Sequence, residues 1–448
     1  MSFDHADPGE LTAFRTDHPD IATVDALITD INGNLIGKRM PISEASGLFD
    51  KGAQIPASAL LLDGRGVGHN PVGMGRSDGD PDASMVPLSG TLVRVPWTER
   101  PTAQVLCSLT HEGAPVWYDP RKILADVVAR CRADGFHPVV ACELEFYLLE
   151  RSREPSGAPR PAPSPRTGAA AREPAMLSVS TLDDHAAVLA GIEDAAAAQH
   201  VPLTYVTAEC GVAQFEINLR HQDDPLLAAD HAVSMRRLVK GAARAAGLDA
   251  TFMARPFLDQ PGSGMHIHVS LLDERGRNCF AEDEAMLRHA IGGMQAAMYD
   301  SVALFAPNFN AFRRFAASWV PRSTSWGENN RTVAFRVPLS EPHARRIEHR
   351  VAGADASPHL VLAAVLAGLH AGIIHRHDPG DPVGSVSLSA LAEDFPTDLL
   401  SALVRMEASP LLREYFPPRF LEAFATVRRG EQAQLLGPIL PREYDYYL

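Results

Sequence analysis

The segment VVACELEFYLL, residues 139–149, decides the fold class of this 448-residue chain. Its even positions are apolar, whereas Glu143 and Glu145 occupy odd positions. Because successive side chains of a β-strand point to opposite faces, this alternation predicts a strand with one buried face. The other face then presents two carboxylates side by side.

Three further segments repeat this pattern of an apolar face beside a polar or charged one. Each pattern alone has an ordinary explanation. A pair of carboxylates at i and i+2 of a strand most often faces solvent, and a His-x-His pair most often has a structural role. An Arg-x-Glu-x-Arg segment usually forms ion pairs at the protein surface. Four such strands together predict a sheet with a charged concave face. The polar positions are Gln214, Glu216 and Asn218 in residues 213–219, His266, His268 and Ser270 in residues 264–272, and Arg346, Glu348 and Arg350 in residues 345–351.

The charged face suits hard divalent cations. Its carboxylates are Glu143, Glu145, Glu209, Glu216 and Glu348. Oxygen ligands with one or two imidazoles favour Mg²⁺ or Mn²⁺ over zinc, and a cation keeps mutually repelling carboxylates ionised. Arginines in the same C-terminal region add planar donors for phosphate or carboxylate oxygens, a combination typical of phosphoryl transfer. These arginines are Arg314, Arg331, Arg336, Arg346 and Arg350.

The rest of the chain predicts two domains. Two extended runs, 24–29 and 35–40, flank an Asn-Gly turn and predict a β-hairpin in a small N-terminal domain. Residues 61–96 are dense in glycine, proline and aspartate and predict long loops. Asp119 and Pro120 predict a helix start at the second domain. We expect a tail at 1–20, domains at 21–115 and 116–448, a disordered insertion at 151–175, and helices at 181–199, 225–247, 281–305 and 355–375.

Composition and charge argue against several classes of function. A net charge of −14 is a poor match for nucleic acid, whose binders cluster Lys and Arg. The most apolar stretch, 360–374, is shorter than the roughly 20 residues of a membrane span, and no secretory signal is visible. The five cysteines are scattered without C-x-x-C spacing. We therefore expect a cytoplasmic protein with reduced thiols that binds neither nucleic acid nor membranes.

Five motifs, in order, resemble the catalytic segments of the type I glutamine synthetase superfamily. The resemblance implies an α+β fold, with a β-grasp N-terminal domain and a larger domain whose curved antiparallel sheet is backed by helices. It also implies two to three Mg²⁺ or Mn²⁺ ions per site, ATP as co-substrate, and a homo-oligomer of two hexameric rings in which a neighbour's N-terminal domain completes each site. The motifs are CELEF (142–146), ECGVAQFE (209–216), GSGMHIH (262–268), NRTVAFR (330–336) and ARRIEHR (344–350).

The resemblance also implies a role for each motif residue in joining glutamate to an amine through γ-glutamyl phosphate. Glu209 and Arg331, together with Asp63 of the N-terminal domain, are the expected catalytic residues. The other expected roles are Glu145, Glu209 and Glu216 for one metal ion, Glu143, His266 and Glu348 for another, Arg331, Arg336, Arg346, His268 and Ser270 for ATP, and Gly262, Arg314 and Arg350 for glutamate.

The sequence departs from the family where ammonia would bind. Val320 stands six residues after Arg314, where the family has a glutamate, and Asp63 is followed by Gly-Arg-Gly instead of Gly-Ser-Ser. Pro261 replaces the family's usual asparagine near the glutamate site. An apolar wall suits a carbon chain, so we expect an organic amine such as putrescine, bound by Asp63, Trp319 and Val320. The alternatives are an ammonia-using glutamine synthetase, a non-catalytic structural oligomer and a guanidino kinase.

Overall fold

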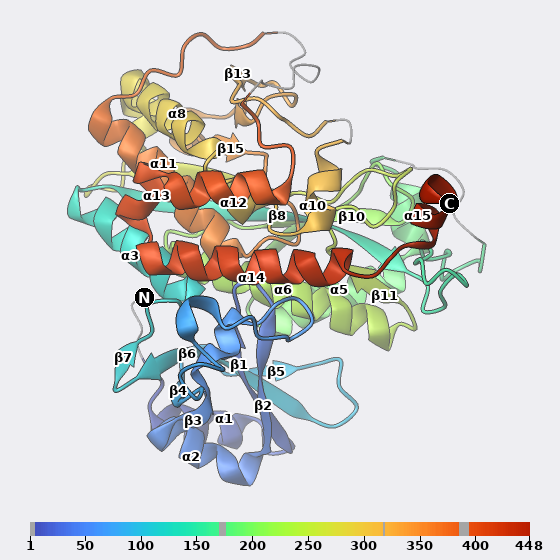
Figure 1. Cartoon of the computed structure of the whole chain (residues 1–448). Coiled ribbons are helices and arrows are strands. Elements are labelled where there is room, and N and C mark those ends of the chain that lie inside the picture. Colours follow the sequence, from blue (N-terminus) through green and yellow to red (C-terminus); the bar gives the residue numbers. More distant parts are fainter. Residues whose placement is uncertain (1–4, 170–175, 317–318, 385–393) are drawn as a thin grey trace.

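The computed structural model describes residues 5–169, 176–316, 319–384 and 394–448. The fold is of the α+β class, with two mixed sheets (Figure 1). The N-terminal sheet forms the blue lower lobe, and the second sheet runs through the larger lobe above it. A single cluster of buried apolar residues extends through both lobes.

The N-terminal sheet contains the predicted hairpin. Strands β1 and β2 pair antiparallel around the Asn32-Gly33 turn, and the positive φ of Gly33 (70°) is one that glycine adopts readily. The strand order is β2-β1-β6-β4-β3, with β1 parallel to β6, and β5 and β7 also pair with β6. The bounds are β1 (Thr23–Thr29), β2 (Leu35–Pro41), β3 (Ala53–Pro56), β4 (Asp82–Pro87), β5 (Val93–Val95), β6 (Thr102–His111) and β7 (Ala114–Pro115).

The second sheet contains the four predicted charged strands, which confirms that part of the sequence analysis. Its order is β13-β14-β15-β12-β8-β10-β9, and β11 also pairs with β8. Neighbouring strands are antiparallel except β13 and β14. The bounds are β8 (His137–Leu149), β9 (Leu203–Ala208), β10 (Gln214–Leu219), β11 (Asp249–Thr251), β12 (Met265–Leu272), β13 (Trp326–Glu328), β14 (Phe335–Val337) and β15 (Ile347–His349).

Helices back this sheet, and α11 is the central one. It packs against α8, α3 and α6. Among the described residues it is the helix long and apolar enough to span a membrane, but 83% of its 18-residue apolar window is buried inside the protein. The helices are α1 (Pro8–Asp17), α2 (Ala45–Lys51), α3 (Pro120–Ala133), α4 (Val179–Asp184), α5 (Ala186–Ala198), α6 (Pro225–Ala245), α7 (Cys279–Glu282), α8 (Glu284–Met298), α9 (Val302–Phe305), α10 (Phe309–Arg314), α11 (Pro358–His375), α12 (Leu399–Ala408), α13 (Pro410–Tyr415), α14 (Pro418–Leu436) and α15 (Pro441–Tyr447).

Three segments differ from expectation. The segment 1–20, expected as a tail, contains helix α1, which Asp7 caps by accepting hydrogen bonds from the first turn. The expected loop region 61–96 contains strands β4 and β5. In the expected disordered insertion, residues 151–169 are described, and Ala162 is fully buried and donates a backbone hydrogen bond to Leu148. Residues 170–175 of that insertion lie outside the described residues.

Candidate active site

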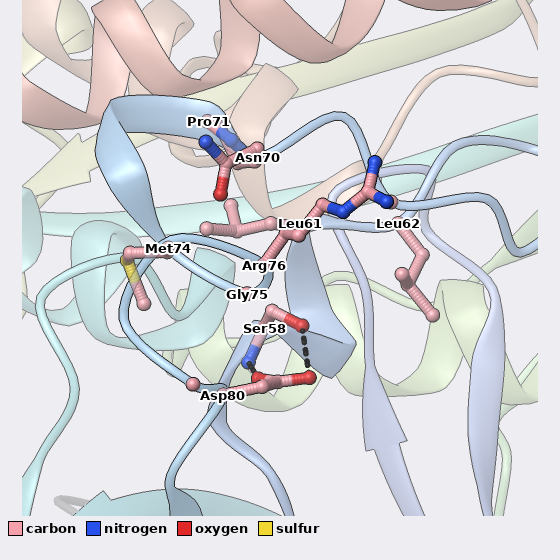
Figure 2. Close-up of a pocket in the computed structure, with 11 residues that line it drawn as sticks. Ser58, Leu61, Leu62, Asn70, Pro71, Met74, Gly75, Arg76 and Asp80 are labelled. Carbon is pink, nitrogen blue, oxygen red and sulfur yellow. Dashed lines mark hydrogen bonds between the residues drawn. The ribbon is translucent and has the colours of Figure 1, made fainter.

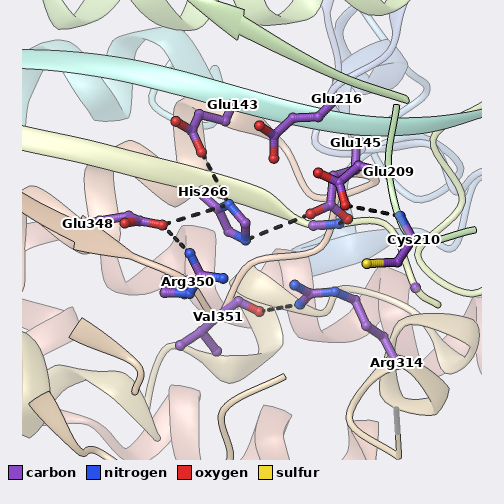
Figure 3. Close-up of polar contacts among 12 residues, drawn as sticks. Glu143, Glu145, Glu209, Cys210, Glu216, His266, Arg314, Glu348, Arg350 and Val351 are labelled. Carbon is purple, nitrogen blue, oxygen red and sulfur yellow. Dashed lines mark hydrogen bonds and ion pairs between the residues drawn. The ribbon is translucent and has the colours of Figure 1, made fainter. Parts of the chain in front are cut away.

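Strand register places the predicted charged residues next to one another across the second sheet. Glu216 of β10 is opposite Glu145 of β8, and His266 of β12 is opposite Glu143. On the other side of β12, His268 is opposite Glu348 of β15. Because directly opposed side chains lie about 5 Å apart, one face brings these groups into a continuous cluster. Figure 3 shows five of its members, Glu143, Glu145, Glu216, His266 and Glu348.

The surroundings of two carboxyl groups of the cluster disfavour the ionised form. Burial, together with the nearby charge of Glu145, raises the pKa of Glu209 to about 7. Burial and the charge of Glu143 raise the pKa of Glu216 to about 9. Such mutual repulsion is relieved when a cation binds between the carboxylates.

Two other carboxylates of the cluster, Glu143 and Glu348, have basic partners. Burial raises the pKa of Glu143, but His268 and His266 outweigh it and hold that pKa well below its usual value. Burial likewise raises the pKa of Glu348, but Arg350 and His268 outweigh it and hold the pKa at about 2. Glu348 accepts a hydrogen bond of 2.6 Å from Arg336 and another from Arg350. Both oxygens of Glu348 are therefore engaged by arginine in this structure.

The donor atoms fit divalent cations. Two groups of three residues place ligand atoms within 4.8 Å of one another: Glu143 with His268 and Glu348, and Glu143 with Glu216 and His266. These oxygen-rich sets match the preference of Mg²⁺ and Mn²⁺. This grouping differs from the two predicted ligand sets. One group contains His268, expected at ATP, which lies 2.8 Å from Glu143. The other joins Glu216 of one predicted set to Glu143 and His266 of the other, and the predicted ligands Glu145 and Glu209 are in neither group. The assignment of each ligand to a particular ion remains a prediction.

A cavity of about 590 Å³ opens beside this cluster and joins most of the predicted site. It is lined by metal-site, glutamate-site and amine-pocket candidates from the sequence analysis. These lining residues are Glu143, Glu145, Glu209, Glu216, His266, Arg331, Gly262, Arg314, Arg350, Trp319 and Val320.

The predicted glutamate site forms one wall of the cavity. A Cβ on Gly262 would come within 2.7 Å of both the Ala254 carbonyl oxygen and the Arg314 side chain, so this position has no room for another residue. Arg314 is buried and donates a 2.7 Å hydrogen bond to the Val351 carbonyl (Figure 3). The wall therefore places the guanidinium of Arg314 in a defined position next to Gly262, a setting suited to a carboxylate.

The predicted amine pocket lies at the same cavity. Val320 is buried, with 8% of its surface exposed, and its neighbour Trp319 is 60% exposed. Trp319 has a φ of 68°, a conformation that non-glycine residues adopt at a cost, often at functional sites. The two side chains give the cavity an apolar wall.

The remaining predicted ATP residues lie toward β14 and β15. Arg336 is paired with Glu348, and Arg346 donates a 3.0 Å hydrogen bond to Nδ1 of His268. Ser270 is buried on β12, two residues beyond His268. These three side chains lie beside the metal-site candidates and outside the lining of the cavity.

Of the three predicted catalytic residues, Glu209 and Arg331 line the cavity and Asp63 does not. Its carboxylate accepts hydrogen bonds from the backbone of Arg65 and Val67 and lies 2.8 Å from His69. The loop around it borders a separate pocket of about 430 Å³, where Asp80 accepts two hydrogen bonds from Ser58 (Figure 2). Asp63 thus stabilises its own loop within the chain.

Sequence reasoning missed several polar residues of the site. Gln214 donates to the Gly262 carbonyl and so ties β10 to the glutamate wall; its place on the charged face was the available signal. His221 packs edge-on against His268, and burial lowers its pKa to about 4. Arg255 and Asp259 line the cavity from an irregular loop, where no periodic pattern marks them.

A sheet that lines one face with glutamates, histidines and arginines beside a cavity is typical of the class of enzymes that combine divalent cations with phosphoryl transfer. The chain belongs to the glutamine synthetase family: the family model described as "Glutamine synthetase, catalytic domain" matches residues 117–447.

Relatives and solved structures extend this similarity over almost the whole chain. The chain is 38% identical to the gamma-glutamylputrescine synthetase of Escherichia coli (strain K12), covering 98% of this chain and 94% of that one. It is 34% identical to the glutamate–isopropylamine ligase of a Pseudomonas species over 80% of each chain. A solved structure of GmaS in complex with ADP superposes with a TM-score of 0.84 and 26% identity, covering 98% of this chain and 99% of that one.

Proposed function

We propose that this protein is an ATP-dependent ligase that joins the γ-carboxylate of glutamate to an organic amine. The observation that carries the choice of an organic amine is the apolar wall of Trp319 and buried Val320, at the cavity that also holds the metal and glutamate candidates. The relatives named for putrescine and isopropylamine ligation support the same choice. Putrescine or another small polyamine is the substrate we favour.

Formation of the amide requires activation, because a free carboxylate is a poor acyl donor. In the first step the γ-carboxylate attacks the γ-phosphorus of ATP, which gives γ-glutamyl phosphate and ADP. In the second step the amine attacks the acyl carbon and phosphate leaves. Both steps depend on holding oxygens in line and neutralising their charge.

The residues of the chain supply that positioning. Arg314 and Arg350 hold the glutamate carboxylate, and Arg331 meets the phosphoryl oxygens from the cavity wall. Glu209 lines the same cavity and accepts the proton that the attacking amine loses. The apolar wall excludes water that would otherwise hydrolyse the acyl phosphate.

Divalent cations belong to this proposal as cofactors. Glu145, Glu209 and Glu216, which line the cavity, would hold one ion. Glu143 with His266 or His268 would hold another. Glu348 would join the second ion once Arg336 and Arg350, which now contact it, bind substrate instead. Mg²⁺ or Mn²⁺ bound there supplies charge neutralisation for the phosphoryl group.

We also propose a homo-oligomer, a dodecamer of two hexameric rings, in the cytoplasm. Two observations support association of the chains. Asp63 lies outside the cavity of its own chain, so its proposed role with the amine requires a neighbour. The C-terminal helix α15 also leaves Tyr446, Tyr447 and Leu448 exposed (71%, 83% and 102%), an apolar surface that another chain can cover. The cytoplasm is proposed on the sequence alone, in which five scattered cysteines lack C-x-x-C spacing.

The test is product formation with purified protein, ATP, Mg²⁺ and glutamate across a panel of amines from ammonium to putrescine. We expect a γ-glutamyl amide of an organic amine, with one phosphate released per amide. Equal or faster turnover of ammonium would instead identify a glutamine synthetase, and phosphate transfer to a guanidino group would identify a kinase.

A further inference from the structure

The loop 255–261 forms one edge of the cavity and is fixed at both ends. Arg255 exchanges two backbone hydrogen bonds with the side chain of Asn310, at 2.8 and 2.9 Å. At the other end, the Tyr147 hydroxyl donates to the Pro261 carbonyl at 2.8 Å. Val212 N also donates to the side chain of Gln260. The backbone of the loop is therefore held at both ends.

Asp259 is the acidic residue of this loop. It lines the cavity and is exposed to solvent. Within the described part of the chain, its carboxylate makes no hydrogen bond or ion pair. The nearest cation along the chain, Arg255, instead donates to the Leu258 carbonyl at 2.7 Å. A negative charge thus stands at the cavity without a partner from the protein.

The other charged groups of the cavity have different positions and chemistry. Glu143, Glu145 and Glu216 project from the strands, Glu209 closely precedes β10, and the arginines suit anions. Asp259 belongs to neither set, because it lies on a loop away from the strand ladder. A carboxylate on an anchored loop, in a cavity also lined by Trp319 and Val320, complements an ammonium joined to a carbon chain.

We propose that Asp259 binds the distal ammonium of a diamine, while the other amine of the same molecule reacts with the acyl phosphate. Asp259 is then a specificity-determining residue that makes diamines better substrates than monoamines of equal length. The carbon chain lies against Trp319 and Val320, and the indole face of Trp319 adds attraction for the cation. This inference rests on the proposed function, since it assigns one end of the proposed amine substrate.

The test compares putrescine with butylamine, which has the same four-carbon chain and one amine. We measure kcat/KM for both with the wild-type protein and with Asp259→Asn, Asp259→Glu and the control Glu274→Gln. Glu274 is an exposed acidic residue of the turn after β12, outside the cavity lining, so its variant removes one surface charge elsewhere. KM values for ATP and glutamate, and the melting temperature, report on the rest of the site and on folding.

We expect wild type to prefer putrescine, and Asp259→Asn to lower that preference by about tenfold or more through a raised KM for putrescine. Butylamine turnover, the KM values for ATP and glutamate, and the melting temperature stay unchanged, while Asp259→Glu retains part of the preference.

A preference that survives in Asp259→Asn overturns the assignment of Asp259 and leaves the proposed function standing. An equal loss in Glu274→Gln overturns it too, in favour of long-range attraction. A wild-type protein that couples no organic amine overturns both.

Discussion

Val320 is the residue that most favours an organic amine over ammonia as the proposed substrate. It lies in an apolar wall where related ammonia-using enzymes are expected to carry a glutamate, and it is 8% exposed. Contact with such a wall stabilises the binding of a carbon chain, because both bury apolar surface, whereas an ammonium ion has no apolar surface to bury.

The substitution Val320→Glu places a carboxylate in this wall. We expect kcat/KM for putrescine to fall by about tenfold or more, because the charged group requires water where the carbon chain binds. The matched control is Val404→Glu, at a valine that is 61% exposed on α12. Steady-state phosphate release with putrescine checks the prediction, and an unchanged kcat/KM in Val320→Glu would remove Val320 from the amine site.

Glu143 is the residue shared by both candidate cation groups. Glu143→Gln keeps its shape and removes its charge, so we expect Mn²⁺ affinity to weaken by about tenfold or more and phosphate release to fall by at least about a hundredfold. The exposed control Glu112→Gln leaves both unchanged. Titration calorimetry with Mn²⁺ reads the affinity directly, and wild-type affinity in Glu143→Gln would contradict the proposed metal site.

At the scale of single residues, the sequence indicated the charged strand positions but not the loop residues. Glu143, Glu145 and His266 follow a period of two, so their shared face could be predicted before any pairing was known. Asp259 and Arg255 reach the cavity through turns whose path no periodicity describes. The position of Asp63 outside the cavity of the same chain also depends on how the domains pack, which local sequence does not specify.

Among the elements, helices α3, α6 and α11 form the base under the sheet and meet at a buried polar group. Asp230 of α6 contacts Arg121 of α3 at 3.0 Å and His359 of α11 at 2.8 Å. All three side chains are at most 9% exposed. Because these side chains are almost fully buried, the negative charge of Asp230 must be compensated by its basic partners.

Removal of the central carboxylate therefore destabilises the fold. We expect Asp230→Asn to lower the free energy of unfolding by about 3–5 kcal/mol, since Arg121 and His359 lose the charge that they contact. Denaturant unfolding measures the change, and Asp50→Asn, at an exposed position of α2, serves as the control. A loss of less than about 1 kcal/mol would show that this contact contributes little.

The same group predicts a loss of stability in acid. Burial raises the pKa of Asp230, but Arg121 and His359 outweigh it and hold the pKa at about 2, below the ordinary value of 3.8. A depressed folded-state pKa stabilises the protein above the unfolded-state pKa, and this contribution is lost as pH falls from about 4 to about 2. The stability difference between wild type and Asp230→Asn should shrink across that window, whereas a constant difference would contradict the assignment.

The elements themselves were predicted where their patterns are long. The apolar alternation of 139–149 and the cap at Asp119 correspond to β8 and α3. Strand β4 was missed because glycines, prolines and aspartates crowd the residues before it, and α1 was missed although Asp7 and Pro8 carry a helix-start signal. Part of 151–169 is held by pairing with β8, a tertiary contact that composition does not reveal.

For the whole molecule, the exposed C-terminal surface of α15 predicts association. Deletion of residues 441–448 removes Tyr446, Tyr447 and Leu448, so we expect a smaller assembly than the full chain forms. Mass photometry compares the two proteins, and substitution of Glu422, an exposed residue of α14, by Gln controls for a nonspecific effect. Identical masses would show that this segment does not hold the assembly together.

The central claim is that the whole molecule is a glutamate–amine ligase for an organic amine. The most direct test is mass detection of the product, with phosphate release, from a single mixture of ATP, Mg²⁺, glutamate and equal concentrations of ammonium and putrescine. The account predicts γ-glutamylputrescine as the main product, with one phosphate for each amide formed. Glutamine as the main product, or no amide at all, would contradict it.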